Sequence, residues 1–62
     1  MRNIDTLYTR LVKAEGAADA LVLAESFTEG ELRALCDLNY EETGGRKATL
    51  VRRVCRAAGW AV

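Results

Sequence analysis

Apolar residues recur along the chain at spacings of three and four, and the pattern predicts four helical segments. No stretch shows the strict alternation of apolar and polar residues that is typical of strands. Alanine, leucine and arginine, which favour helices, are abundant, and proline is absent. The sequence therefore predicts an all-α fold, a small bundle of three to four helices.

The first helix is expected from about Asn3 to Ala14. One face carries a stripe of apolar residues at helical spacing, made of Ile4, Leu7, Tyr8, Leu11 and Val12. The side chain of Asn3 or Asp5 can cap its start, and Gly16 is expected to end it.

The second helix, Ala17 to Glu25, reads AADALVLAE and is apolar on nearly every side. Such a helix is typical of the centre of a bundle or of an interface with another chain. The same residues could also continue the first helix past a bend at Gly16, and the pattern leaves both possibilities open.

The third helix has a strong start signal. Thr28 precedes Glu31 by three residues, which is the capping-box spacing, in which each side chain bonds a free backbone N–H. Asn39 suits the helix end because asparagine tolerates left-handed φ values. The expected buried stripe is Leu32, Leu35 and Cys36, and Leu38 could extend it.

Residues 40–45, YEETGG, read as a connection in which the Tyr40 ring enters the core and the two glutamates stay solvated. The last helix should begin near Gly45 or Arg46 and run to about Ala58. Gly59 is a natural left-handed terminator, which would let Trp60 fold back and close the small core.

Sixty-two residues allow a single domain, residues 1–62, with one small core and little room for a deep substrate pocket. There is no histidine, so histidine-based catalysis and Cys/His zinc sites are excluded. The two cysteines are expected to be buried in a reducing compartment. No cofactor, metal or enzymatic activity is expected, and without an apolar run of membrane-spanning length we expect a cytoplasmic protein.

The zero net charge conceals a division of charge along the chain. Residues 1–43 hold all nine acidic residues and four basic ones, a net charge of −5. Residues 44–62 hold five basic residues and no acid, a net charge of +5. This asymmetry indicates a local electrostatic footprint, unless the basic segment only neutralises the acidic one within the fold.

The basic residues of the last helix fall mainly on one arc, opposite an apolar arc that can pack inward. Its start, GGRK, lacks the acidic residue that usually complements the positive end of the helix dipole. Small residues there let a phosphate approach the free N–H groups, so Gly44 and Gly45 are candidate site residues. The cationic and polar candidates on the outer arc and at the tip are Arg46, Lys47, Thr49, Arg52, Arg53 and Arg56.

A solvated basic face without a ligand explains the same pattern, and Glu41 and Glu42 could neutralise Arg46 and Lys47. The stretch GGRKAT lacks the phosphate-loop spacing and no strand precedes it, so nucleotide hydrolysis is not expected.

Residues 31–54, ELRALCDLNYEETGGRKATLVRRV, resemble the SAP-type helix–extended loop–helix motif and the related modules of the Rho terminator N-terminus and LEM domains. The usual Gly-Leu pair is replaced by Asn39-Tyr40, and the connection is one residue longer. The remaining matches to the pattern are Leu32, Leu35 and Cys36 in the first helix and Gly45, Arg46, Lys47, Leu50, Val51, Arg53 and Val54 in the second half.

The resemblance divides the chain into an N-terminal helical extension, residues 1–26, and a SAP-like unit, residues 27–59. Because SAP-type modules generally bind DNA through its backbone, it implies that Gly45, Arg46, Lys47 and Arg53 face phosphates. The helical arc adds Thr49, Arg52 and Arg56. LEM domains, which share this motif, bind protein. The resemblance in fold therefore does not by itself determine the ligand.

Two functions follow as hypotheses. The first is a non-enzymatic module that binds DNA phosphates with low sequence specificity, too weakly to act alone without tandem copies, dimerisation or fusion. The second is a protein-interaction adaptor or inhibitor, of phage or regulatory type, that uses its acidic and apolar N-terminal helices to attract a basic partner. The sequence leaves the oligomeric state open.

Overall fold

The computed structural model describes residues 2–62, and this range contains four α-helices and no β-strand. The helices are α1 (Ile4–Val12), α2 (Ala17–Glu25), α3 (Glu29–Leu38) and α4 (Lys47–Ala57). The predictions of an all-α fold and of a separate second helix are confirmed. Within the described range, no helix combines the length and the apolar character needed to cross a bilayer.

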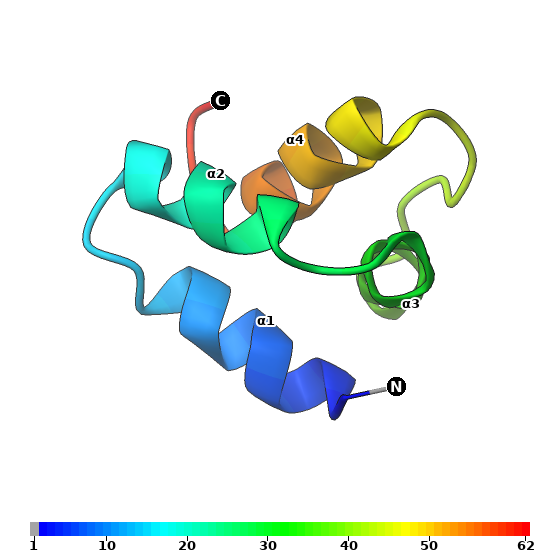
Figure 1. The fold of residues 1–62 in the computed structure, drawn as a ribbon, viewed down its shortest axis with the longest axis horizontal. Coiled ribbons are helices and arrows are strands. Elements are labelled where there is room, and N and C mark those ends of the chain that lie inside the picture. The colour runs from blue at the N-terminus through cyan, green and yellow to red at the C-terminus, as the bar shows by residue number, and fades with distance from the viewer. Residues whose placement is uncertain (1) are drawn as a thin grey trace.

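The helices surround one core, with α1 and α2 stacked in Figure 1 and α3 seen nearly end-on beside them. The α3–α4 connection lies at the opposite edge of the molecule from the α1–α2 turn, and α4 runs back from it behind α2 (Figure 1). The start of α4 therefore lies away from α1.

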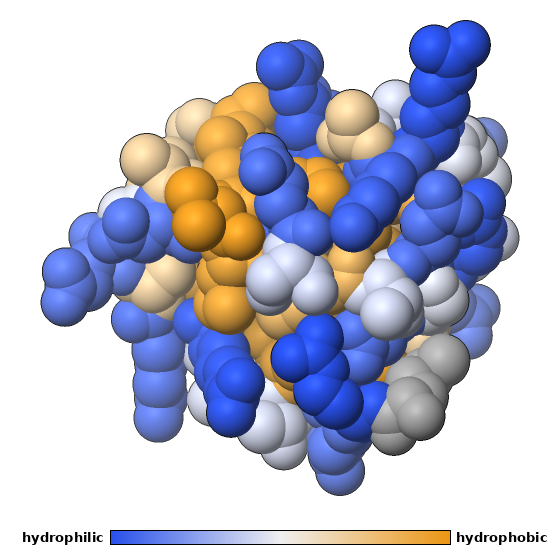
Figure 2. Space-filling view, in the orientation of Figure 1, coloured by the Kyte–Doolittle hydropathy of each residue, from blue (hydrophilic) through white to orange (hydrophobic). Residues whose placement is uncertain are grey.

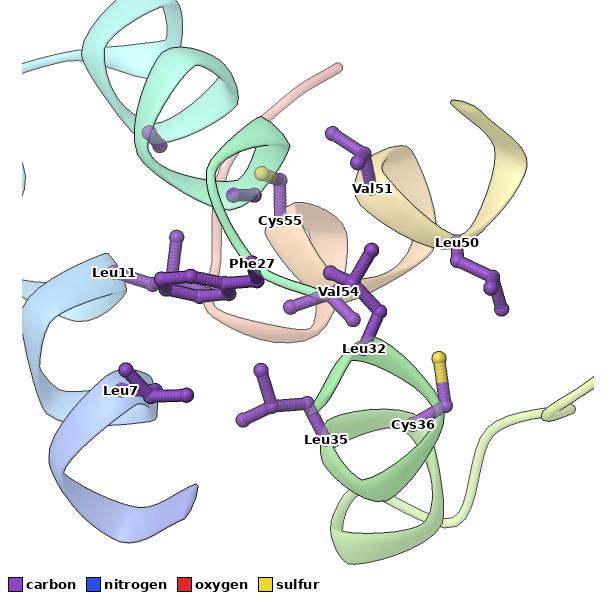
Figure 3. Packing of buried hydrophobic residues seen from close by; sticks show 12 residues of the cluster. Leu7, Leu11, Phe27, Leu32, Leu35, Cys36, Leu50, Val51, Val54 and Cys55 are labelled. Atoms are coloured by element: carbon purple, nitrogen blue, oxygen red, sulfur yellow. The ribbon is translucent and has the colours of Figure 1, made fainter. Parts of the chain in front are cut away.

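The core draws on all four helices, and Phe27, between α2 and α3, lies in the middle of the side chains in Figure 3. The predicted stripes supply most of it, but Val12 and Leu38 are exposed, contrary to expectation. Both are the last residues of their helices, where the neighbouring helices no longer cover the stripe. The other buried apolar residues are Leu7, Leu11, Ala20, Ala24, Leu32, Leu35, Cys36, Leu50, Val51, Val54 and Cys55.

Both cysteines are buried free thiols, on α3 and α4. Burial raises the pKa of the Cys36 thiol and of the Cys55 thiol. They are therefore neutral at pH 7 and act as small apolar side chains, as expected for buried free cysteine.

Helix α1 is capped by Asn3, whose Oδ1 accepts from the Thr6 N–H at 3.1 Å. It ends earlier than predicted, with Lys13 as the C-terminal cap, because the Ala14 N–H turns back to the Leu11 carbonyl. Gly16 does not end α1. It has an extended backbone and is the N-cap of α2, so the continuous-helix alternative is wrong.

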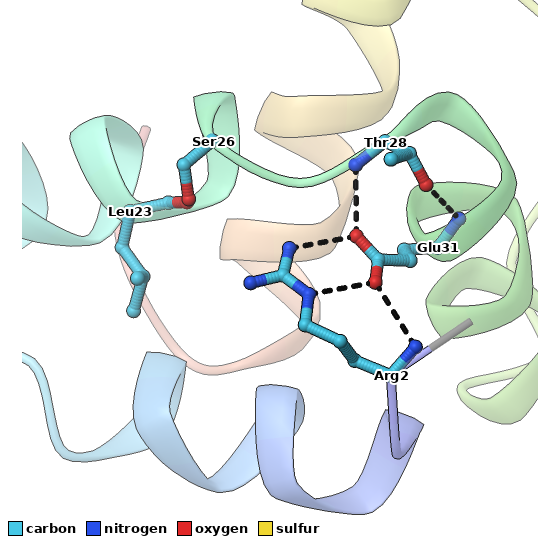
Figure 4. Close-up of polar contacts among 5 residues, drawn as sticks. All are labelled: Arg2, Leu23, Ser26, Thr28 and Glu31. Atoms are coloured by element: carbon cyan, nitrogen blue, oxygen red, sulfur yellow. Dashed lines mark hydrogen bonds and ion pairs between the residues drawn. The ribbon is translucent and has the colours of Figure 1, made fainter.

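The predicted capping box of α3 is confirmed. The Thr28 hydroxyl accepts from the Glu31 N–H at 3.1 Å, and the Glu31 carboxylate accepts from the Thr28 N–H at 2.9 Å (Figure 4). The same carboxylate, 3% exposed, also accepts two hydrogen bonds of 2.8 Å from the Arg2 guanidinium. Since the Arg2 guanidinium lies 5.4 Å from the Phe27 ring centroid, this carboxylate holds the Arg2 side chain over the core.

The left-handed residue at the end of α3 is Tyr40, with φ of 58°, and not Asn39, with φ of −99°. The N–H groups of Tyr40 and Glu41 donate to the carbonyls of Asp37 and Cys36, which forms a Schellman motif. The motif turns the Tyr40 side chain outward, where it is 96% exposed. The prediction that its ring enters the core is therefore wrong.

Helix α4 ends with Ala58 as its C-cap, and Gly59, with φ of 101°, is the predicted left-handed terminator. The Trp60 N–H donates to the Cys55 carbonyl, and its indole Nε1 donates to the Leu11 carbonyl at 2.8 Å. The hydroxyl of Tyr8, in turn, donates to the Ala57 carbonyl at 3.1 Å. The two aromatic residues thus fasten the ends of α1 and α4 together, and Trp60 packs against the core as expected.

The Arg2–Glu31 pair should make stability depend on pH. Hydrogen bonds from Arg2 and Thr28 hold the pKa of Glu31 well below its usual value of about 4.5. The ionised carboxylate therefore stabilises the folded state fully above that value, and the contribution is lost as the pH falls below it. Glu31→Gln, which keeps a capping side chain, should lower the free energy of unfolding in urea at pH 7 but progressively less below pH 4.5.

Glu29→Gln is the matched control, because Glu29 lies in the same helical turn and makes only an exposed pair with Arg33 at 3.7 Å. It should change stability by no more than about 0.5 kcal/mol at any of these pH values. A constant difference between wild type and Glu31→Gln from pH 7 to pH 3 would contradict the assignment.

Replacing Tyr40 by glycine should stabilise the protein. The left-handed conformation costs a non-glycine residue roughly 1–2 kcal/mol, and the exposed ring has little packing to lose. Glycine costs roughly 0.5–1 kcal/mol in added freedom of the unfolded chain, so urea unfolding should show a net gain of up to about 1.5 kcal/mol. Asn39→Gly, at a negative φ, should instead destabilise, since Asn39 Nδ2 donates to the Leu35 carbonyl at 2.8 Å.

Candidate nucleic-acid interface

The start of α4 is uncapped. Arg46 is the N-cap and makes no side-chain capping bond, and the first turn contains no acidic residue. The first amide of this region with a partner is that of Leu50, which donates to the Arg46 carbonyl at 3.0 Å. Within residues 2–62, the N–H groups of Lys47, Ala48 and Thr49 find no acceptor, so the positive end of the helix dipole is open.

The connection before α4 is held by its carbonyl groups. Arg53 Nη1 donates to the carbonyls of Glu42 and Gly44 at 2.6 and 2.7 Å. Arg33 Nη2 donates to the Gly45 carbonyl at 3.4 Å. Two arginines, one from α3 and one from α4, thus draw three loop carbonyls to the same side.

Peptide geometry fixes the other side of the loop. In a planar trans peptide the N–H points opposite to the carbonyl. The N–H groups of Thr43, Gly45 and Arg46 therefore point away from the two guanidinium groups, and none has an acceptor in the described part of the chain. Together with the first turn of α4, they form a run of open donors.

Position 45 requires glycine because its φ is 111°. Position 44 has no positive φ and does not require glycine. A Cβ on Gly45 would lie 3.6 Å from Thr49 Cγ2, an ordinary contact, so the constraint there is the backbone angle. No heavy atom lies within 4 Å of a Cβ built on Gly44. The two glycines thus leave the loop open to a bulky anion from outside.

The predicted basic arc is divided among different sides of α4. Arg46, Lys47, Thr49 and Arg52 are exposed, and their side chains make no ion pair with any residue from 2 to 62. Arg56 is exposed too, but its Nε donates to the Val62 carbonyl at 2.6 Å.

Arg53 differs from the other cations. Its side chain is only 19% exposed, and besides the loop carbonyls it lies 4.0 Å from the Glu42 carboxylate. The Glu42 carboxylate is therefore near Arg53, and neither it nor Glu41 forms an ion pair with Arg46 or Lys47 in the described structure. The loop acids do not neutralise the tip of α4 by direct pairing.

Sequence reasoning missed Arg33, and it assigned Glu25 only to the acidic N-terminal surface of the adaptor hypothesis. Arg33 holds the Gly45 carbonyl from α3, and no feature of its surroundings in the sequence signals this role. Glu25, at the end of α2, lies with Lys47 and Arg52 around one surface hollow. The positions of both residues relative to α4 depend on how the helices pack.

No protein-family model, curated protein or solved structure matches this chain. The resemblance to SAP-type modules therefore stays a prediction.

Arg52 and Arg53 should respond differently to the same substitution. Arg53→Gln removes the charged donor from two loop carbonyls, and we expect a loss of about 1–3 kcal/mol in the free energy of unfolding. Arg52→Gln removes an exposed side chain and should change it by no more than about 0.5 kcal/mol.

The measurement is urea unfolding of both variants, together with NMR order parameters for residues 42–46. In Arg53→Gln the order parameters of these residues should fall, while those of the helices stay near the wild-type values. Equal effects of the two variants on the loop would refute the role given to Arg53.

Proposed function

We propose that this protein is a small non-enzymatic module that binds nucleic acid, most simply duplex DNA, through its phosphates and with low sequence specificity. The observation that carries the proposal is the run of open N–H donors from Thr43 to Thr49, with no acid in the first turn of α4. Oriented amides at a helix start favour phosphate oxygens, which accept several hydrogen bonds at once.

The exposed cations supply the long-range attraction. Arg46 and Lys47 lie at the tip, and Arg52 lies one turn further along α4. Thr49 can add a hydroxyl donor, and Arg56 can extend the contact along the backbone once it leaves the Val62 carbonyl. Contacts of this kind position a duplex but do not read its bases, which is why low specificity is expected.

Arg53 has a supporting role in the proposal. Its guanidinium is occupied by loop carbonyls, so it shapes the donor surface and contributes charge without a direct phosphate contact. We assign residues 28–58 to a SAP-like helix–extended loop–helix unit on the same grounds: a capped helix, a non-helical segment with a left-handed glycine, and a basic helix.

Duplex binding should be weak and steeply dependent on salt. If about four phosphates are contacted, log K should fall with log[salt] at a slope of roughly −3 to −4, and unrelated duplexes should bind alike. The measurement is fluorescence anisotropy with short labelled duplexes at several salt concentrations. NMR titration should shift the amides of residues 43–53.

Lys47→Gln tests the site, because loss of one phosphate contact should reduce the magnitude of the slope by about 1. Arg10→Gln is the matched control, since Arg10 is an exposed cation on α1, away from the tip of α4. Absence of duplex binding at low salt, or equal losses in the two variants, would rule out the proposed interface.

A further inference from the structure

A surface hollow of about 480 Å³ lies between α2 and the start of α4. Its volume falls within the range of roughly 300–1,000 Å³ that is usual for binding pockets, but it is open to solvent. The floor of the hollow is not used by the proposed phosphate contacts, whereas its rim shares Lys47 and Arg52 with them. The hollow is lined by Leu21, Glu25, Lys47, Ala48, Val51 and Arg52.

The floor of the hollow is apolar. Leu21 is half-buried, and Val51 is 3% exposed at the bottom. Val22, the residue after Leu21 on α2, is 69% exposed. On the face that α2 shares with α1, Figure 2 also shows apolar surface surrounded by hydrophilic side chains.

This apolar surface follows from the composition of α2. Only Ala20 and Ala24 of this helix are fully buried. Its larger apolar side chains are therefore partly buried or exposed. A contiguous apolar area rimmed by polar residues usually marks an interaction surface.

The charges around the hollow indicate the partner's chemistry. Lys47 and Arg52 stand on the α4 rim, and neither makes an ion pair with residues 2–62. The open N–H groups of Lys47 and Ala48 lie at the same rim. The complement of this rim is a carboxylate, and the complement of the floor is an aliphatic or aromatic side chain.

We propose that the hollow binds an acidic amphipathic helix of a partner protein. One apolar side chain of that helix rests on Leu21 and Val51, and its neighbouring carboxylates meet Lys47 and Arg52. This reverses the expectation of a basic partner for the N-terminal helices. The apolar floor disfavours a nucleic-acid strand at this position, and Glu25 on the α2 side requires the partner's carboxylates to lie on the α4 side, at Lys47 and Arg52.

The proposal does not depend on nucleic-acid binding. If both hold, the acidic helix and a duplex compete for Lys47 and Arg52, because the same cations would neutralise either ligand. The partner would then release the protein from nucleic acid.

The test is a selection from a displayed library of random peptides about 15 residues long, near the length at which helices become marginally stable. The folded 62-residue chain is the bait. Ala48→Phe is the deciding variant, because Ala48 is exposed and the added ring fills the hollow without changing the charge. Ala61→Phe, at an exposed alanine outside the hollow, is the matched control.

The expected result is enrichment of peptides with net negative charge and apolar residues at helical spacing. Selected peptides should bind Ala48→Phe about tenfold or more weakly, the loss expected when one buried apolar anchor is displaced, and Ala61→Phe like wild type. Lys47→Glu should weaken them as well. On titration of the wild-type protein, the amides of Leu21, Ala48 and Val51 should shift.

Several outcomes would overturn the proposal. They are enrichment of basic or neutral peptides, equal recovery on Ala48→Phe and wild type, or no enrichment at all. If the same amides shift with protein concentration alone, the hollow is an interface with a second copy of this chain, and the proposal fails. It also fails if they shift with duplex DNA while no peptide binds.

Discussion

The helices of this protein are too short to be stable singly, so each depends on the one core that they share. They contain nine to eleven residues, and isolated helices below about 12–15 residues are marginal in water. Phe27, fully buried between α2 and α3, lies in the middle of that core. The same dependence explains why the helix ends are tied to each other: Tyr8 bonds the end of α4, Trp60 bonds the end of α1, and Arg2 bonds the start of α3. At the start of α4, Arg33 bonds the preceding Gly45 carbonyl and leaves the first N–H groups of the helix open.

Two adjacent arginines have different roles at the start of α4. Arg53 points toward α3 and holds the loop by its carbonyls, which turns several N–H groups outward. Arg52 points toward α2 and borders the hollow. A single basic run in the sequence thus builds two surfaces, a donor-rich loop and a cationic rim over an apolar floor. Lys47 belongs to both, so the two surfaces are coupled through its side chain.

Features fixed by local backbone chemistry were predictable from the sequence. The capping box of Thr28 and Glu31 and the Gly59 terminator each follow from a few neighbouring residues, and Asn3 was one of two caps that the sequence offered for α1. The errors lie where packing decides. Val12 and Leu38 continue their stripes but extend past the neighbouring helices, and Tyr40 takes the left-handed position because α3 reaches one residue further than expected. For the site, helical periodicity gave the exposed cations at the tip, but it could not show that the loop folds over Arg53.

The indole of Trp60 has a practical consequence for anyone who studies this protein in solution. It is the only tryptophan, it packs against the core, and its nitrogen is bonded to the last turn of α1 from the opposite end of the chain. Its intrinsic fluorescence therefore reports the docking of the two chain ends. The loop before α4 is far from it in the sequence and contributes no tryptophan signal, so emission intensity distinguishes global unfolding from loosening of that loop without any added label.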